Sequence, residues 1–284
     1  MVVLHHILCT IIFKYLNFYD KHVYKRVCIF TSHIHITDLY DIDIKYLDKL
    51  NDIILSNYKF VIKLDAENNK NITNINHMTK LKVLNASGDC GIDDNGIMNI
   101  DLEKLCMNYN EEIIHISHMK SLKELHIGGI CGIDNLHILD LNLEILHVGY
   151  NPNVSNINHM TKLKELRANG STCIIDDECI KNLNLEILNV SFNDRITDVN
   201  HMTNLKVLTA KSSRGIGDSS IRNINLEKLD ASSNSNISHV NHMTNLRELD
   251  ASGDCGIGYE GIKNLNINTI KCEHNPRLKK IEKI

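Results

Sequence analysis

Proline, aromatic side chains and paired cysteines are all scarce in this sequence. Only 2 prolines, no tryptophan and 5% aromatic residues occur among 284 residues. The 9 cysteines are odd in number, and no two of them form a CxxC pair. This usage argues against an extracellular protein held together by disulfides and is typical of a reduced compartment. We therefore expect the protein to be cytoplasmic.

The sequence also lacks an excess of charge of either sign and a long apolar run. The 31 Lys and Arg residues against 35 Asp and Glu residues give a net charge of −4, so neither a nucleic acid nor a membrane surface is an expected partner. The apolar stretch over residues 2–13 is broken by His5 and His6, lacks a signal-peptide cleavage site, and is too short to cross a bilayer. We expect it to form a helix of the folded protein.

The dominant feature of the sequence is an internal repeat. The dipeptide His-Met recurs five times, at spacings of 41, 41, 42 and 41 residues. Each period divides into two half-repeats of 20–22 residues that begin with the pattern L-x-x-L-x-φ, where φ is apolar. The first kind begins at Leu81, Leu122, Leu163, Leu205 and Leu246, and the second kind begins at Val61, Leu102, Leu143, Leu185, Leu226 and Ile267. A regular period of this kind indicates a solenoid of stacked coils.

The second kind of half-repeat continues to an asparagine, and the full pattern L-x-x-L-x-φ-x-x-N resembles the leucine-rich-repeat signature. The asparagines are Asn69, Asn110, Asn151, Asn193, Asn234 and Asn275. The resemblance implies that the leucines point inward from short parallel strands and that each Asn side chain bonds backbone groups of adjoining coils. Replacing Asn151 or Asn193 should therefore destabilise the protein more than replacing Asn158 or Asn204, which we expect to be exposed.

The predicted fold is an α/β solenoid, a leucine-rich-repeat arc of about 11 half-repeats over residues 61–284. Between the strands, apolar residues fall at every third position, as at Ile113, Ile116 and Met119. This period predicts a convex side of 3₁₀ turns and coil. The second leucine of each motif should lie in a single core, as Leu84, Leu105, Leu125, Leu146, Leu166, Leu188, Leu208, Leu229 and Leu249.

The first kind of half-repeat carries cysteines close to the asparagine position, at Cys90, Cys131, Cys173 and Cys255. It resembles the cysteine-containing repeats of F-box/LRR proteins. Composition and repeats are also similar to leucine-rich-repeat proteins encoded by AT-rich large DNA viruses of protists, which implies a host cytoplasm. Equivalent residues two coils apart lie about 10 Å from one another, so we expect small buried thiols and no disulfides among these cysteines.

Residues 1–40 resemble a degenerate F-box, the segment through which F-box proteins bind a Skp-type adaptor. The adaptor-binding positions implied by the resemblance are Leu4, Leu8, Ile12, Phe13 and Leu16. His5 and Lys21-His22 depart from the pattern. The resemblance implies a substrate-recognition subunit of an SCF-type ubiquitin ligase. The alternative is a small α-helical N-terminal cap with no adaptor role, and in either case residues 41–60 would connect this segment to the repeats.

We expect a partner protein to bind the concave face of the solenoid, where strand positions 3, 5 and 7 point outward. The predicted contact residues are Lys63, Asp65, Asn85, Lys104, Asn108, Glu124, His126, His147, Glu165, Arg167, Asn189, Thr209, Lys211, Lys228, Asp230, Glu248, Asp250 and Lys271. The protein would then be a protein-binding scaffold. The alternative is a plain interaction or structural protein of the same fold, with no role in ubiquitin ligation.

The sequence contains no recognisable catalytic or phosphate-binding motif. The repeated histidines are 41 or 42 residues apart and therefore lie about 10 Å from one another, too far to share one metal ion. We expect them to be framework residues on the convex side. The predictions are therefore that the protein is not an enzyme, holds no metal or cofactor, and is a monomer.

Overall fold

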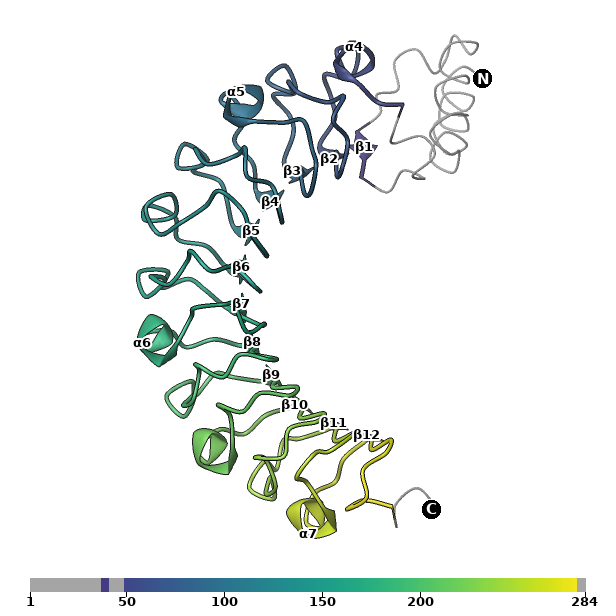
Figure 1. Ribbon diagram of the computed structural model, residues 1–284, viewed down its shortest axis with the longest axis vertical. Coiled ribbons are helices and arrows are strands. Elements are labelled where there is room, and N and C mark those ends of the chain that lie inside the picture. The colour runs from purple at the N-terminus through teal and green to yellow at the C-terminus, as the bar shows by residue number, and fades with distance from the viewer. Residues whose placement is uncertain (1–36, 41–48, 280–284) are drawn as a thin grey trace, which may run out of the picture. The chain divides into compact units, whose positions relative to one another are not determined.

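The computed structural model describes residues 37–40 and 49–279 (Figure 1). The chain forms two compact units, Met1–Leu122 and Lys123–Ile284. The predicted F-box-like or cap helices fall on residues outside the described ranges. The same holds for the predicted adaptor-binding residues, which are Leu4, Leu8, Ile12, Phe13 and Leu16.

The described part of the first unit is a parallel sheet with short turns between its strands. Its strands are β1 (Asp38–Leu39), β2 (Lys63–Asp65), β3 (Val83–Asn85) and β4 (Lys104–Cys106), and its helices are α4 (Asp52–Leu55) and α5 (Asp94–Ile97). Each strand pairs with the next one along the chain, so Leu39, Leu64, Leu84 and Leu105 lie side by side. The pairing thus begins ahead of residue 61, the expected start of the repeats. The early start escaped prediction because β1 has only 2 residues and follows no complete repeat motif.

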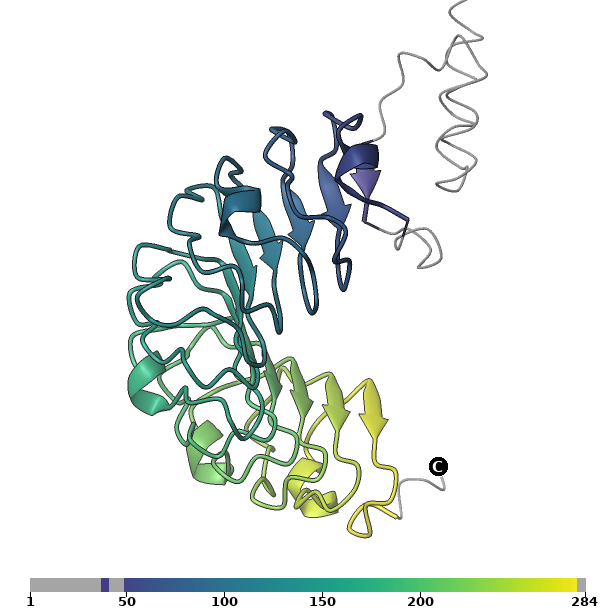
Figure 2. The same cartoon turned by 45° about the horizontal axis from the view of Figure 1, so that its top comes forward.

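The second unit continues the same construction. Its strands are β5 (Glu124–His126), β6 (Ile145–His147), β7 (Glu165–Arg167), β8 (Ile187–Asn189), β9 (Val207–Thr209), β10 (Lys228–Asp230), β11 (Glu248–Asp250) and β12 (Thr269–Lys271). Its helical turns are α6 (Asp177–Ile180), η2 (Asp218–Ile221) and α7 (Tyr259–Ile262). Consecutive strands pair in parallel. Figure 2 shows these strands side by side, with the helical turns on the opposite side of the coils.

The core lies between the strands and the turns. All of the predicted core leucines from Leu84 to Leu249 are at most 2% exposed, which confirms the predicted register. The methionines of the His-Met dipeptides are fully buried on the turn side, as Met78, Met119, Met160, Met202 and Met243. Burial of one such side chain contributes roughly 1.5–3 kcal/mol relative to exposure. Each period therefore contributes its own buried leucines and methionine to the core.

The repeated asparagines bond the backbone of adjoining coils, as predicted. The Nδ2 atom of Asn193 donates to the carbonyl oxygens of Ala168 (2.8 Å) and Ile175 (3.1 Å), and its Oδ1 atom accepts from the N–H of Arg195 (2.9 Å). Equivalent donation to a carbonyl of an earlier coil is made by Asn69, Asn110, Asn151, Asn234 and Asn275. All of these side chains are buried, so they satisfy backbone groups that water does not reach.

The prediction that Asn158 and Asn204 are both exposed is wrong for one of them. Asn204 is exposed, but Asn158 is half-buried. The side chain of Asn158 donates to the carbonyl oxygen of Glu178 and accepts from the N–H of Asn182 (3.1 Å). Asn158 thus bonds the next coil on the turn side and belongs to the framework of the fold.

The turn side also differs from the prediction of 3₁₀ turns and coil. The η2 segment is a 3₁₀ turn, but α4, α5, α6 and α7 are single turns of α-helix. The side chains of Asn51, Asp93 and Asp176 accept a backbone N–H inside the following helix, at 2.9–3.0 Å. N-caps of this kind satisfy the free N–H groups of a first helical turn. In the described half-repeats of the second kind, which carry the repeated asparagine, the strand is followed by turns and not by a helix, as predicted.

Candidate protein-binding surface

The strands expose two aligned rows of side chains in the second unit. Side chains alternate along a strand, so the residues before and after the buried central residue point away from the core. The first row is Glu124, Ile145, Glu165, Ile187, Val207, Lys228, Glu248 and Thr269, and the second row is His126, His147, Arg167, Asn189, Thr209, Asp230, Asp250 and Lys271. Neighbours within a row are about 4.8 Å apart. We call these two rows the strand face.

The structure places the predicted contact residues on the strand side of their own unit. In the second unit all of them belong to the strand face except Lys211, which follows β9. In the first unit the corresponding positions are occupied by Lys63, Asp65, Asn85 and Lys104, with Asn108 just after β4. Every one of these predicted residues is half-buried or exposed. Cys106, in the same row of the first unit, is only 7% exposed.

A polar cluster forms where β5, β6 and β7 lie side by side. The imidazole rings of His126 and His147 stack with their centroids 3.8 Å apart and their planes 22° from parallel. The Nε2 atom of His126 is 2.8 Å from an oxygen of Glu124, and that of His147 is 3.1 Å from an oxygen of Glu165. Arg167 donates through Nε to the same Glu165 oxygen at 2.8 Å. We call these five residues the histidine cluster.

The electrostatics of the histidine cluster keep His147 neutral. Burial lowers the pKa of His147, and the positive charge of Arg167 lowers it further, against the opposing effect of Glu165. For Glu165, burial would raise the pKa, but hydrogen bonds from Arg167 and His147 lower it overall. Near neutral pH the cluster therefore holds a neutral His147, an ionised Glu165 and the permanent charge of Arg167 in one hydrogen-bonded group.

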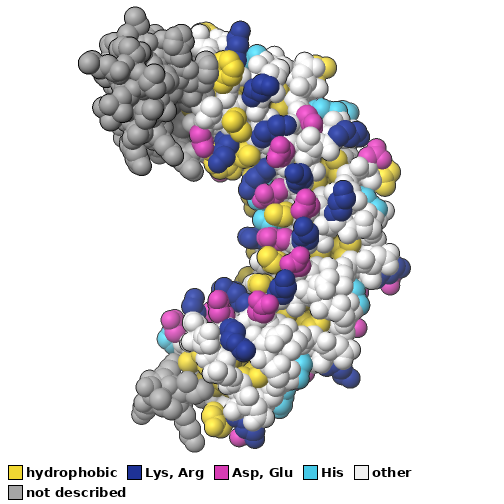
Figure 3. Space-filling view, turned by 180° about the vertical axis from the view of Figure 1, so that it is seen from behind, with side chains coloured by type: hydrophobic (Ala, Val, Ile, Leu, Met, Phe, Trp, Pro, Cys, Tyr) yellow, Lys and Arg dark blue, Asp and Glu magenta, His cyan; other side chains and the backbone are white. Residues whose placement is uncertain are grey.

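An alternating row of charges borders the strand face and was missed in the sequence. The residue two places before each strand's central leucine is alternately basic and acidic: Lys123, Glu144, Lys164, Glu186, Lys206, Glu227 and Arg247. Lys164 pairs with Glu144 and Lys206 with Glu186, each at 3.2 Å. Figure 3 shows basic and acidic side chains interleaved along this side of the molecule. Each exposed pair contributes at most about 1 kcal/mol, and the row as a whole carries no strong field of either sign.

Four of the five repeated histidines bond the framework on the turn side, as predicted. The Nε2 atoms of His77, His159, His201 and His242 lie 3.0–3.2 Å from carbonyl oxygens of the preceding coil. A neutral ring that donates through Nε2 leaves Nδ1 as an acceptor, and at His159 this second nitrogen is buried without a partner. Among residues 37–40 and 49–279, no group of three or more His, Cys, Asp or Glu side chains is placed to hold a metal ion.

Acidic residues in the helical turns form a further ladder that the sequence did not suggest. Asp218 accepts from the N–H groups of Ser238 (2.7 Å) and His239 (3.1 Å) in the next coil, and from the Ser238 hydroxyl. Burial would raise the pKa of Asp218, but these hydrogen bonds lower it overall. Asp52, Asp94 and Asp177 accept backbone N–H groups in the same way. The turn side is therefore largely engaged in holding the coils together.

The cysteines of the described coils are buried free thiols. Burial raises the pKa values of Cys90, Cys173 and Cys255 to about 11. A thiol with so high a pKa is almost entirely protonated at neutral pH and is a poor nucleophile. Their burial as free thiols agrees with the predicted small buried side chains. Within the described part of the chain, no helix is both long and apolar enough to cross a bilayer.

Comparison with solved structures decides the type of fold. An internalin (InlF) from Listeria monocytogenes superposes with a TM-score of 0.54 and 21% identity, over 78% of this chain and 71% of that one. The fold is of the leucine-rich-repeat type. The functional domain of another internalin, InlJ, gives a TM-score of 0.38 at 16% identity, over 77% of this chain and 63% of that one. A complex of Rad7 and Elc1 from yeast gives 0.40 at 15% identity, over 84% of this chain and 87% of that one.

No protein-family model matches the sequence. No curated protein matches it either. At 21% identity the likeness to the internalin establishes the fold, and leucine-rich-repeat solenoids commonly bind proteins through their strand side. Function therefore has to be argued from the surface of this chain.

Proposed function

We propose that this protein is a monomeric scaffold that binds another protein on the strand face of its second unit and catalyses no reaction. The observation that carries the proposal is the histidine cluster, a hydrogen-bonded set of charged and neutral polar side chains on that face. In the cluster, Glu165 accepts from both His147 and Arg167. Side chains fixed before binding lose little conformational entropy when a partner arrives.

Arg167 is the proposed centre of this contact. Its side chain is 52% exposed while its Nε atom is held by Glu165. Arg167 is thus both exposed and anchored, and Arg is among the residue types that dominate protein–protein binding energy. The strand face carries both signs of charge, so the proposed partner is a protein with a mixed surface, and neither a nucleic acid nor a membrane is part of the proposal.

Site-specific photo-crosslinking in the native cell tests this proposal. A photoreactive residue is placed at Lys211, beside the strand face, or at Lys162, which is exposed between strands. We expect a discrete protein adduct from position 211 that is lost in an Arg167→Ala variant and retained in an Arg222→Ala variant, since Arg222 is exposed on the turn side after η2. An adduct from position 162 alone, or one indifferent to Arg167→Ala, would show that the strand face is not the binding surface.

We further propose that residues 1–40 bind a Skp-type adaptor, so that the strand face would present a substrate to a ubiquitin ligase in the cytoplasm, or in the host cytoplasm if the protein is viral. The support for this is the F-box resemblance at Leu8, Ile12, Phe13 and Leu16. Co-precipitation of the adaptor with the wild type, but not with a Phe13→Asp, Leu16→Asp double variant, is the expected result. Lys14→Asp is the matched control. No adaptor captured by the wild type would leave the cap as the role of this segment.

A further inference from the structure

Two aromatic side chains of the second unit occupy backbone positions that disfavour them, as Tyr109 does in the first unit. In the second unit, the third residue beyond the end of each strand has a positive φ. These residues are Gly129, Tyr150, Gly170, Phe192, Ser212, Ser233, Gly253 and His274. Glycine adopts this conformation freely, whereas a bulky side chain is strained there. Tyr150 (φ 61°) and Phe192 (φ 58°) nonetheless carry rings at this position. The same conformation recurs at serine and histidine in other coils, so it belongs to the repeat, and the rings of Tyr150 and Phe192 are what sets these two positions apart.

Burial does not account for the two rings. Tyr150 is 44% exposed and Phe192 is 43% exposed. The ring of Tyr150 lies against Gly170 in the next coil, where an added Cβ would come within 2.5–2.7 Å of three ring carbons. Glycine is therefore needed at position 170 for two reasons: its φ is 96°, and any Cβ would collide with the Tyr150 ring. The Tyr150 ring is held in a fixed orientation with its outer side open to solvent.

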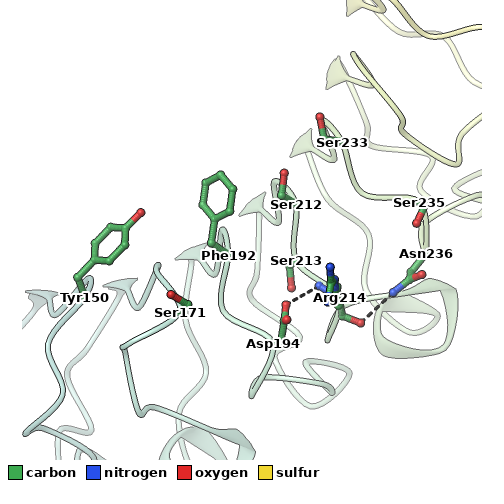
Figure 4. Close-up of a pocket in the computed structure, with 10 residues that line it drawn as sticks. All are labelled: Tyr150, Ser171, Phe192, Asp194, Ser212, Ser213, Arg214, Ser233, Ser235 and Asn236. Atoms are coloured by element: carbon green, nitrogen blue, oxygen red, sulfur yellow. Dashed lines mark hydrogen bonds between the residues drawn. The ribbon is translucent and has the colours of Figure 1, made fainter.

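The spacing of the rings follows from the sheet. The N–H of Tyr150 donates to the carbonyl of Asn169 (2.7 Å), that of Gly170 to Ser191 (2.7 Å), and that of Phe192 to Lys211 (3.0 Å). The hydrogen-bonded ladder thus extends beyond the strands to this edge, and two strand spacings separate the rings by about 10 Å. Figure 4 shows both rings projecting to the same side of the coils, with Ser171 between them.

A hollow of about 560 Å³ adjoins the rings and is lined mostly by polar residues. Its polar walls include Ser171, Ser212 and Arg214. The backbone of Arg214 is fixed, because its N–H donates to Asp194 and its carbonyl accepts from Asn236, each at 2.8 Å. One carboxylate oxygen of Asp194 and the amide nitrogen of Asn236 thus hold this loop in place, and the serine hydroxyls and the exposed side chain of Arg214 line the hollow beside them.

We propose that this edge, which we call the aromatic edge, binds a proline-rich segment of a partner protein in the polyproline II conformation. That helix has three residues per turn and rises 3.1 Å per residue, so prolines three apart lie about 9.3 Å apart on one side. This spacing matches the rings of Tyr150 and Phe192. Polyproline II makes no internal hydrogen bonds, so its carbonyl groups accept from donors such as Ser171, Ser212 and Arg214. Docking between aromatic rings is a recurrent mode of proline-rich recognition.

The chemistry of the hollow favours a peptide over a sugar chain, the other ligand that stacks on spaced aromatic rings. Proline-rich segments offer backbone carbonyl groups that accept and few N–H groups that donate, which suits the donor-only guanidinium of Arg214, whereas sugar hydroxyls both donate and accept. One oxygen of Asp194 and the amide nitrogen of Asn236 are bonded to the Arg214 backbone, which fixes the place of the Arg214 donors. The aromatic edge borders the strand face at Lys211 but shares no residue with the histidine cluster, so Tyr150→Gly and Phe192→Gly test this inference while Arg167→Ala tests the function proposed above.

The test is fluorescence anisotropy with the full chain and labelled peptides. The probes are decaproline and a library of twelve-residue peptides that contain P-x-x-P with varied flanks. We expect saturable binding that weakens at least tenfold in Tyr150→Gly and in Phe192→Gly. Because glycine relieves the positive-φ strain, both variants should stay folded, with an unchanged or higher thermal midpoint. Tyr259→Ala, which removes an exposed ring elsewhere in the unit (57% exposed), is the matched control and should bind as the wild type does.

Three outcomes would overturn the proposal. The first is that no proline-rich peptide binds the wild type. The second is that binding is the same in the Tyr150→Gly and Phe192→Gly variants as in the wild type. The third is that a β-1,4-linked glucose hexamer, added as a competitor or as a labelled probe, binds in a manner that depends on the rings while the peptides do not.

Discussion

Replacing Asn193 with alanine should destabilise the protein far more than a surface change. The substitution removes the donors to the carbonyl oxygens of Ala168 and Ile175 and the acceptor for the N–H of Arg195. Asn193 is 1% exposed, so these backbone groups lose their partners in a place that water does not reach. One unsatisfied buried group costs about 1–3 kcal/mol. Three groups lose a partner here, but part of the cost is recovered as they relax, so we expect the free energy of unfolding to fall by about 3 kcal/mol.

Urea unfolding of the full chain, followed by circular dichroism, measures this loss. Asn204→Ala is the control, since Asn204 is exposed and should change the free energy of unfolding by no more than about 0.5 kcal/mol. Asn158→Ala should fall between them, at about 1 kcal/mol, because its side chain bonds Glu178 and Asn182 at the half-buried turn side. Equal losses for Asn193→Ala and Asn204→Ala would refute the account of the asparagine ladder.

Further predictions concern the histidine cluster, one thiol and one glycine. Burial lowers the pKa of His147 from its ordinary 6.5, so as pH falls the unfolded chain takes up a proton before the folded one does, and stability should decrease below about pH 6.5. The thermal midpoint of the His147→Gln variant should therefore depend less on pH between pH 6.5 and 5.5 than that of the wild type. An equal dependence in both proteins would contradict the argument. The lowered pKa of Glu165 adds a separate loss below its ordinary 4.5, visible as a second fall in the same titration. Cys173, with a pKa of about 11, should react with a maleimide at pH 8 only after denaturant is added, and rapid labelling of the native protein would place the thiol at the surface. Gly170→Ala should cost about 2 kcal/mol in urea unfolding, because its φ is 96° and the new Cβ would meet the Tyr150 ring; a neutral result would mean that the ring moves freely.

The repeat predicted the features that depend on position alone. Leu166 and Asn193 could be assigned to the core because a residue at a fixed place in a repeat has the same surroundings in every coil. The same reasoning placed His126 and His147 on the strand side. It could not show that their rings stack or that Glu165 joins His147 to Arg167, because these contacts depend on side-chain rotamers, which spacing does not determine.

Local backbone conformation was the other part that escaped prediction. Asp93 and Asp176 lie in stretches whose apolar period indicated turns and coil, yet each caps a turn of α-helix. Their place before a possible helix was the available signal. The strain at Tyr150 was visible only indirectly, since Gly129 and Gly170 occupy the equivalent place in the flanking coils. A glycine that alternates with a ring does not by itself reveal a positive φ.

The alternation of the bordering charges has a consequence for how such a chain can change in length. If the coil that contains Lys164 and Gly170 were deleted, Glu144 would stand beside Glu186, two like charges at the starts of adjacent strands. The ring of Tyr150 would also meet Phe192 where it now rests against a glycine. Deleting two consecutive coils would restore both alternations. Insertions and deletions should therefore be accepted in steps of about 41 residues, so the unit that a gene could duplicate or lose without damage is the pair of coils.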